Sequence, residues 1–220
     1  MRKLLLTTAA VAAAIAGAFA DETDFGTFTD TRDGQTYKTV KMPDGKTWMA
    51  QNLNYKTTRG SWCYKDSLSY CKKYGRLYEW DAAMKACPSG YHLPSGPEWD
   101  DLAKAVGGKK RPIEKGYWEG NIWYDAGKML KAKHGWVWDD ECNLCGDGTD
   151  NYGFSALPGG FRDSDGSFGY AGSNGDWWTA TEDNSNAAYE RNMNYGKDSV
   201  IEYSDAKNIG NSVRCVADRP

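Results

Sequence analysis

Cysteine is the residue type whose spacing points to the most definite chemistry in this sequence. The six cysteines are Cys63, Cys71, Cys87, Cys142, Cys145 and Cys215. An even number favours disulfides in an exported chain, although six cysteines allow fifteen connectivities. Cys63 and Cys71 flank a loop short enough for one bridge, and a bridge between Cys87 and Cys215 would tie an early helix to the last strand. Under the chain-entropy model, that long closure would contribute about 4 to 5 kcal/mol.

The remaining pair, Cys142 and Cys145, has C-x-x-C spacing. It could close on itself, or it could offer two thiolates to zinc, which would need two further ligands. The histidines that could supply them are His92 and His134. We expect a disulfide here, because the start of the chain predicts export. His92 is expected to be a hydrogen-bonded structural residue.

Motifs for catalysis are weak. Ser155 lies in G-F-S-A-L, which lacks the second glycine of a nucleophile elbow. The sequence has neither the G-x-x-x-x-G-K of a phosphate loop nor the H-E-x-x-H of a zinc protease. Several acids could form the carboxylate pair of a glycoside hydrolase, and no pairing is favoured. They are Asp100, Glu119, Asp139, Glu141 and Glu182. We therefore expect no catalytic role. The alternatives to a binding module are an envelope enzyme (thiol redox or glycoside-hydrolysing) and a structural cell-surface assembly protein.

Two oxygen-rich turns could bind calcium. The segment 163–166, Asp-Ser-Asp-Gly, opens like a calcium loop but lacks the closing Glu, and Asp147, Asp150 and Asn151 surround a glycine. Asp and Asn in such places more often hydrogen-bond their own turns. Calcium is therefore a minor expectation, and no metal site or cofactor is predicted.

Glycines alternate with aromatic residues throughout the segment 148–182. Glycine permits positive φ and close backbone approach, while aromatic rings bury large areas. The segment is therefore expected to form short strands and tight turns over an aromatic core. Asp165-Gly166 is a favourable hairpin turn within it.

Trp177 and Trp178 are adjacent near the end of this segment. Neighbouring side chains in a strand point to opposite faces, so one indole could enter the core while the other is exposed. An exposed indole beside Tyr170, Arg162 and Asp176 could stack on a sugar or bind a protein. These five residues form the predicted ligand-binding site, and the alternative is that both tryptophans are structural.

The first twenty residues have the features of an export signal. Arg2 and Lys3 precede an apolar run over residues 4–16, and Ala18-Phe19-Ala20 fits a cleavage site. Removing the two basic residues leaves 25 basic against 30 acidic residues, so the net charge falls from −3 to −5. No basic patch suits nucleic acid, and the apolar run is too short to span a membrane. We expect a secreted or cell-surface protein that binds a polysaccharide or a cell-surface partner.

The remainder of the chain predicts one α+β domain over residues 33–220, preceded by a loose lead-in over residues 21–32. Pro43-Asp44-Gly45 joins two strand-like runs into a hairpin, and Ser95 and Glu98 form a capping box. Helices are predicted at 77–86 and 97–106, with a short third helix at 126–133. Strands are predicted at 187–194, 199–203 and 212–216. Early helices followed by many short strands are typical of α+β domains.

Five motifs resemble the Fibrobacter succinogenes major paralogous domain family. They are G-R-L-Y-E-W-D-A-A-M-K-A-C-P-S-G-Y-H-L-P-S-G-P-E-W-D-D-L, D-G-K-T-W-M-A-Q-N-L-N-Y, Y-G-F-S-A-L-P-G-G-F-R, G-D-W-W-T-A-T-E and S-V-R-C-V-A-D, and together they span about Asp33 to Asp218. The resemblance implies a C-type lectin-like fold, in which two main helices pack on short twisted antiparallel sheets. It also implies a bridge from the first helix to the last strand, which matches Cys87 with Cys215. The resemblance implies no particular activity, and the calcium-binding tripeptides of sugar lectins are absent.

Overall fold

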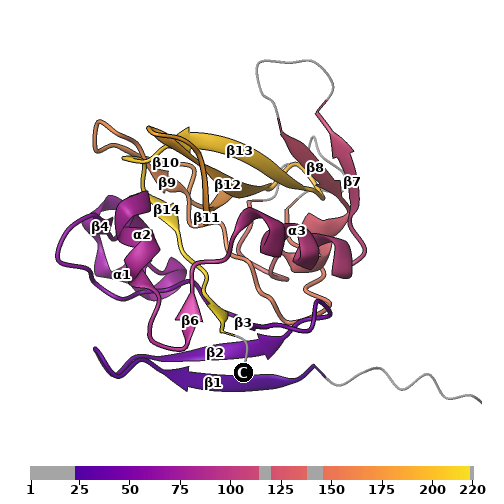
Figure 1. The fold of residues 1–220 in the computed structure, drawn as a ribbon, viewed down its shortest axis with the longest axis horizontal. Coiled ribbons are helices and arrows are strands. Elements are labelled where there is room, and N and C mark those ends of the chain that lie inside the picture. Colours follow the sequence, from indigo (N-terminus) through magenta and orange to yellow (C-terminus); the bar gives the residue numbers. More distant parts are fainter. Residues whose placement is uncertain (1–22, 114–119, 138–145, 219–220) are drawn as a thin grey trace, which may run out of the picture.

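The structure is a computed structural model that describes residues 23–113, 120–137 and 146–218. Two β-sheets and a small separate hairpin dominate the described residues (Figure 1). The five-stranded sheet has the order β1-β2-β3-β15-β6. Its strands are β1 (Phe25–Thr29), β2 (Thr36–Lys41), β3 (Thr47–Met49), β15 (Val216–Ala217) and β6 (Tyr91–His92). Because β15 pairs with both β3 and β6, the first and last strands of the chain belong to one sheet.

The larger sheet has eight strands in the order β4-β5-β14-β11-β12-β13-β8-β7. They are β4 (Ser61–Trp62), β5 (Leu77–Tyr78), β14 (Asn211–Ser212), β11 (Asn174–Asn184), β12 (Ala187–Asn194), β13 (Val200–Ala206), β8 (Asn121–Tyr124) and β7 (Lys109–Pro112). The antiparallel meander of β11, β12 and β13 forms its centre. The separate hairpin pairs β9 (Phe161–Arg162) with β10 (Phe168–Gly169).

Four α-helices accompany the sheets in the described residues. They are α1 (Leu68–Tyr74), α2 (Trp80–Ala86), α3 (Gly96–Ala105) and α4 (Ala126–Leu130), and a 3-10 turn, η1, spans Tyr64–Asp66. The predicted capping box opens α3: Glu98 N donates to Ser95 Oγ over 3.3 Å, and Ser95 N donates to Glu98 Oε2 over 2.9 Å. The presence of four helices beside largely antiparallel sheets in the described residues confirms the predicted α+β class.

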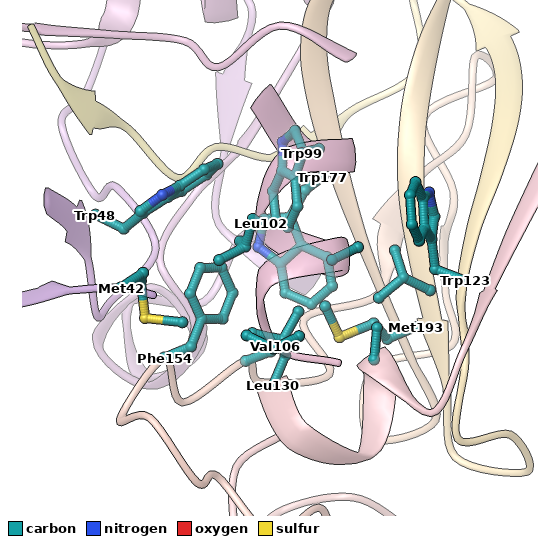
Figure 2. Close-up of a cluster of buried hydrophobic side chains, with 14 of the residues drawn as sticks. Met42, Trp48, Trp99, Leu102, Val106, Trp123, Leu130, Phe154, Trp177 and Met193 are labelled. Atoms are coloured by element: carbon teal, nitrogen blue, oxygen red, sulfur yellow. The ribbon is translucent and has the colours of Figure 1, made fainter. Parts of the chain in front are cut away.

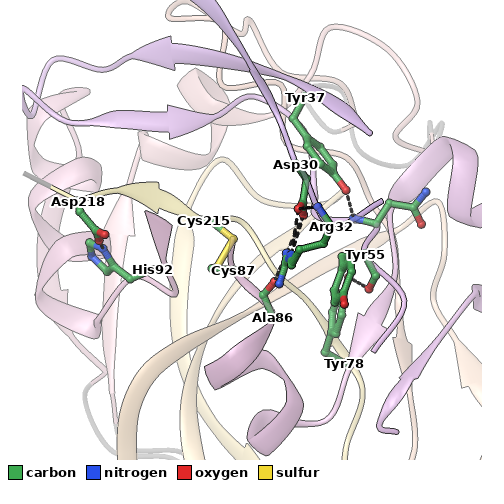
Figure 3. Close-up of a disulfide and its surroundings, with 11 residues drawn as sticks. Asp30, Arg32, Tyr37, Tyr55, Tyr78, Ala86, Cys87, His92, Cys215 and Asp218 are labelled. Atoms are coloured by element: carbon green, nitrogen blue, oxygen red, sulfur yellow. Dashed lines mark hydrogen bonds and ion pairs between the residues drawn. A yellow bond between two sulfur atoms is a disulfide. The ribbon is translucent and has the colours of Figure 1, made fainter. Parts of the chain in front are cut away.

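Two local expectations are wrong. Residues 23–32, expected to be a loose lead-in, contain β1, which pairs with β2 along its whole length. Tertiary contacts hold this polar edge: Arg32 binds Asp30 and donates to the carbonyl of Ala86 at the end of α2 (Figure 3). The predicted helix at 77–86 begins only at Trp80, because residues 77–78 pair as β5 with β4 and β14.

Helix α3 lies between the two sheets and carries the centre of the first hydrophobic core (Figures 1 and 2). The Trp99 ring packs 5.2 Å from Trp48 of β3, 5.7 Å from Phe154 and 6.2 Å from Trp177 of β11. Leu102 from the next turn joins the same cluster. Four large rings therefore fill the space between the sheets. Two of them, Phe154 and Trp177, come from the segment 148–182, which was predicted to form an aromatic core.

A second core lies around α2. It contains Tyr78, Trp80, Ala83, Trp178 and Ala188. Trp80 Nε1 donates to the Thr179 carbonyl over 2.8 Å, which fixes α2 to β11. The large sheet is therefore covered at β11 by one core on each face.

Both predicted disulfides within the described residues form. Cys63 joins Cys71, 8 residues away, and Cys87 joins Cys215, 128 residues away. Cys87 caps α2 and Cys215 precedes β15, so the long bridge links the second helix to the last strand (Figure 3). Cys142 and Cys145 lie outside the described residues.

Candidate functional site

The two tryptophans of the predicted site are both fully buried, so the expectation of an exposed indole is wrong. Trp177 and Trp178 each have a relative exposure of 0%. They do alternate across β11 as predicted, with Trp177 in the core around α3 and Trp178 in the core around α2. Trp177 Nε1 donates to Asn52 Oδ1 and Trp178 Nε1 donates to the Tyr78 carbonyl. Because both faces of the sheet are covered here, neither ring is available to a ligand.

Asp176 lies on the same face of β11 as Trp178 and belongs to a buried cluster of acids and amides. It accepts a 2.5 Å hydrogen bond from Asn192 Nδ2 of β12. On the same face, Glu190 accepts a 2.5 Å bond from Asn211 Nδ2 of β14. The four side chains of this acid–amide cluster, Asp176, Glu190, Asn192 and Asn211, are all buried.

The electrostatics of this cluster follow from its burial. Burial raises the pKa of Asp176 to about 7. Burial, with the negative charge of Asp176 second, raises the pKa of Glu190 well above its usual value. Asp205 of β13 faces the same way, and burial followed by repulsion from Asp163 raises its pKa. Near neutral pH this cluster therefore retains protons that exposed carboxyl groups would have lost.

The hairpin of β9 and β10 adjoins this cluster through two backbone pairings. Arg162 N and O bond Gly210 O and N over 2.9 and 2.8 Å, and Gly160 N donates to Asn174 O over 2.8 Å. Continuing the Arg162–Gly210 register puts Phe161 opposite Asn211 of the cluster. The predicted Asp165-Gly166 turn closes the hairpin, with Gly166 at a φ of 91°.

Tyr170 follows the hairpin and is the predicted site residue that the structure leaves most open to solvent. Its exposure is 60%, and its ring stacks on Phe161 with centroids 5.5 Å apart and planes 19° apart. Its φ is 65°, a left-handed conformation that costs a bulky residue about 1 to 3 kcal/mol. The backbone amides of Ser173 and Asn174 donate to the Tyr170 carbonyl and hold this turn. The ring is therefore backed by Phe161 and still largely exposed to solvent.

Arg162 points to the other side of the hairpin. It pairs with Phe168 across β9 and β10, and its guanidinium lies 4.0 Å above the Trp62 ring of β4. Tyr64, inside the loop that the Cys63–Cys71 bridge closes, packs 5.4 Å from Phe168. We name Tyr170, Phe161, Arg162 and Trp62 the hairpin site.

Other sequence candidates are occupied by structural contacts. Asp100 binds Arg191 over 2.8 Å and Lys110 over 2.9 Å. Burial alone would raise the pKa of Asp100, but these two cations outweigh it and the pKa is lowered. Glu182 pairs with Lys207 over 2.6 Å. Glu119, Asp139 and Glu141 lie outside the described residues.

The oxygen-rich turns are occupied by hydrogen bonds to protein groups, and Asp147 and Asn151 bond outside their own turn, to Trp136 N and Met129 Sδ. Asp163 accepts from Ser164 N, Asp165 accepts from Ser167 N, and Asp150 accepts from both the N and Oγ of Ser155. Among the residues whose positions are described, no three His, Cys, Asp or Glu side chains come together in a way that could hold a metal ion.

His92 is hydrogen-bonded, as expected. Its Nδ1 lies 2.6 Å from Asp218 Oδ1 (Figure 3). Its Nε2 lies 3.1 Å from Glu98 Oε1. Burial alone would lower the pKa of His92, but the bonds to these two carboxylates outweigh it and the pKa is raised. His92 therefore joins β6 to α3 and to the end of the chain.

Sequence reasoning missed Phe161, Trp62 and the acids Glu190 and Asp205 as neighbours of the predicted residues. The strand prediction at 187–194 contained Glu190, but its polar neighbours Arg191 and Asn192 gave no sign that the strand is buried on both faces. Trp62 carried no such signal, since it reaches the hairpin only through the order of strands in the sheet.

Comparison with protein families matches residues 40–217 to a family model described as the Fibrobacter succinogenes major domain. No curated protein and no solved structure matches the chain. In the part of the chain that the structure describes, no helix combines the length and the apolar character needed to cross a membrane.

Proposed function

We propose that this chain, which belongs to the Fibrobacter succinogenes major domain family, is a non-catalytic module that binds polysaccharide at the hairpin site. The observation that carries the proposal is Tyr170, an exposed ring in a left-handed conformation, stacked on Phe161. Strained backbone at an exposed aromatic residue favours a functional role over a packing role. Flat rings of this kind supply contact area at low entropic cost, which suits the apolar faces of sugar rings.

Hydrogen-bonding groups for sugar hydroxyls lie next to the ring. Asp163 comes directly after β9, two residues from Phe161, and its charge acts on Asp205 of β13. On the other side of the hairpin, Arg162 offers guanidinium N–H groups above Trp62. A polysaccharide crossing the hairpin would meet an aromatic surface first and polar groups at its sides, as binding sites with an apolar centre and a polar rim do.

We propose a non-catalytic role because the carboxyl groups with the most strongly raised pKa values are not accessible to a substrate. Asp176 is 4% exposed and Glu190 is 3% exposed, and each accepts a hydrogen bond from an amide. A glycoside hydrolase needs both carboxyl groups in contact with its substrate. This pair is therefore assigned to the interior of the sheet.

A C-type lectin-like fold and export form part of the same proposal. The fold is supported by the pairing of the first and last strands in one sheet and by the Cys87–Cys215 bridge that ties a helix to the last strand. Export to the cell surface or beyond is supported by the signal-like residues 1–20 and by two disulfides. Both features suit a protein that meets insoluble or surface-bound glycans.

The test uses residues 21–220 with intact disulfides, incubated with insoluble cellulose and with a glycan array. We expect retention on at least one glycan, and we expect Tyr170→Ala to weaken it about fivefold, since a lost aromatic contact is worth about 1 kcal/mol. Tyr124→Ala is the matched control, because Tyr124 is another exposed tyrosine, 43% exposed on β8 and away from the hairpin site. Circular dichroism checks that each variant folds.

Two results would overturn the proposal. One is a failure of the wild-type protein to bind any glycan, which would favour a structural protein or a protein partner. The other is an equal loss of binding in Tyr170→Ala and Tyr124→Ala. Release of reducing ends from a retained polysaccharide would instead favour the enzyme.

A further inference from the structure

A groove of about 320 Å³ is lined by the start of β2, by the segment 50–54 that follows β3, and by the last turn of α1, with Ser155 and Leu157 completing its wall. Its volume is at the low end of the range for small-molecule sites. Tyr74 forms part of its wall and stacks on Tyr70, with centroids 6.0 Å apart. We name it the lysine groove after three of its lining residues, Lys38, Lys72 and Lys73.

The charge of the lysine groove contrasts with that of the whole chain. The chain has 30 acidic against 27 basic residues, yet the lining contains three lysines and no Asp or Glu. Lys38, Lys72 and Lys73 are exposed, and within the described residues none of them pairs with a carboxylate. Lys73 Nζ lies 4.7 Å from the centre of the Tyr74 ring. The nearby Asp33 is bound by the backbone and side-chain amides of Gln35 and does not line the groove.

A fourth positive charge lies beneath the groove. Arg214 is 1% exposed, and its Nη2 donates to Asn52 Oδ1 over 2.8 Å and to the Ser155 carbonyl over 3.3 Å. Asn52 and Ser155 both line the groove. Burial lowers the pKa of Arg214 to about 9, so the guanidinium stays charged at neutral pH. No carboxylate pairs directly with it among the described side chains. The charge of Asp150, which accepts hydrogen bonds from Ser155, acts on the guanidinium and offsets part of its field, and the remainder adds to that of the lysines.

The remaining lining groups suit hydroxyl groups. Gln51 is exposed and uses Oε1 to accept from Lys38 N over 2.8 Å, which leaves its NH₂ group for a ligand. Gln35 and Thr36 also line the groove, with Gln35 bonded to Asp33 and Asn54 and Thr36 bonded to Thr29. Amide and hydroxyl groups beside an aromatic ring match the alternating polar and apolar surfaces of a sugar.

We propose that the lysine groove binds a carboxylate-bearing sugar unit, the repeating unit of an acidic polysaccharide. The lysines and the buried Arg214 attract the carboxylate, while Gln51 and its neighbours bind the hydroxyl groups. This inference deepens the proposed function by naming an acidic glycan as ligand, but it rests on residues separate from the hairpin site and does not require that site to bind.

The test titrates trigalacturonic acid into the disulfide-intact protein by calorimetry, with galactotriose as the neutral probe and sodium sulfate as the simple anion. We expect trigalacturonic acid to bind, and we expect raised salt to weaken it because exposed ion pairs are screened. The triple variant Lys38→Gln, Lys72→Gln, Lys73→Gln should lose about tenfold in affinity, since each exposed pair is worth about twofold.

The matched control is Lys41→Gln, Lys85→Gln, Lys104→Gln, which removes the same charge from the other face of β2 and from the ends of α2 and α3. The affinity of this control for trigalacturonic acid should stay within about twofold of the wild-type affinity, because exposed charges act only at short range. The proposal is overturned if trigalacturonic acid does not bind, if the control loses as much affinity, or if galactotriose or sulfate binds equally well. Loss of trigalacturonic acid binding with intact Tyr170-dependent retention on neutral glycans would remove this inference and leave the hairpin site standing.

Discussion

Three consecutive residues of β11, Asp176, Trp177 and Trp178, are all buried, but on different faces of the strand. Asp176 and Trp178 point to one face, and Trp177 points to the other. The alternation is a local property of the strand. The burial of all three depends on what covers each face, namely α3 on one side and α2 on the other. An adjacent Trp pair is therefore no evidence for an exposed ring.

Asp176 makes the stability of the fold depend on pH. Its folded pKa of about 7 lies above the ordinary value of 3.8, so the folded state binds more protons than the unfolded chain between these values. Stability therefore falls as pH rises from about 4 to about 7. In Asp176→Asn we expect the melting temperature to fall less steeply over this range, because no charge develops at this buried position. The variant also removes the negative charge of Asp176 that helps to raise the pKa of Glu190.

Thermal melts followed by circular dichroism at intervals from pH 4.5 to pH 8 measure that slope. Asp81→Asn, an exposed substitution on α2, serves as the control and should keep the wild-type slope. An unchanged slope in Asp176→Asn would show that the carboxyl group is ionised normally in the folded protein.

Among the elements, α3 has the most complete set of local signals. Ser95 and Glu98 cap its first turn, Pro97 occupies that turn, and Trp99 and Leu102 lie on its buried face. These signals act within the helix itself, which is why its position was predicted to within one residue. The position of α1 was not predicted, since it is a short helix inside a disulfide loop.

Removing the α3 cap should destabilise the whole domain, because this helix carries Trp99 between the two sheets. We expect Ser95→Ala to lower the free energy of unfolding by about 1 kcal/mol. Ser95→Thr retains a hydroxyl acceptor and should recover most of the loss. Urea denaturation followed by tryptophan fluorescence measures both variants, and equal stability of Ser95→Ala and wild type would contradict a structural role for the cap.

At the scale of the whole molecule, the chain closes on itself. The last described strand, β15, pairs with β3 and β6, and Cys215 joins Cys87 beside it (Figure 3). The chain between β3 and β15 supplies the strands of the large sheet and the hairpin site. The long bridge therefore restricts most of the unfolded chain, whereas the short Cys63–Cys71 bridge restricts only one loop.

The two bridges should differ in their effect on stability. In the chain-entropy model, replacing Cys87 and Cys215 by Ala costs about 5 kcal/mol, and replacing Cys63 and Cys71 by Ala costs about 2.5 kcal/mol. Urea denaturation of the two double variants gives the comparison. A larger loss from the short bridge would mean that local packing around Tyr64, and not loop closure, determines its contribution.

The sequence alone determined those features that depend on neighbours along the chain. These are the capping box of α3, the Asp165-Gly166 turn, the strand at 187–194 and the short loop that the Cys63–Cys71 bridge closes. Each is set by backbone propensity or by short-range hydrogen bonds, so residue types in order are sufficient to indicate it.

Only the tertiary structure decided which predicted site residues remain available. It buried Trp177, Trp178 and Asp176, left Tyr170 exposed, and brought Trp62 to Arg162 across nearly one hundred intervening residues. Burial and long-range contact depend on which elements pack on each face of a strand. An alternating sequence pattern indicates which residues share a face of a strand, but it does not indicate what covers each face.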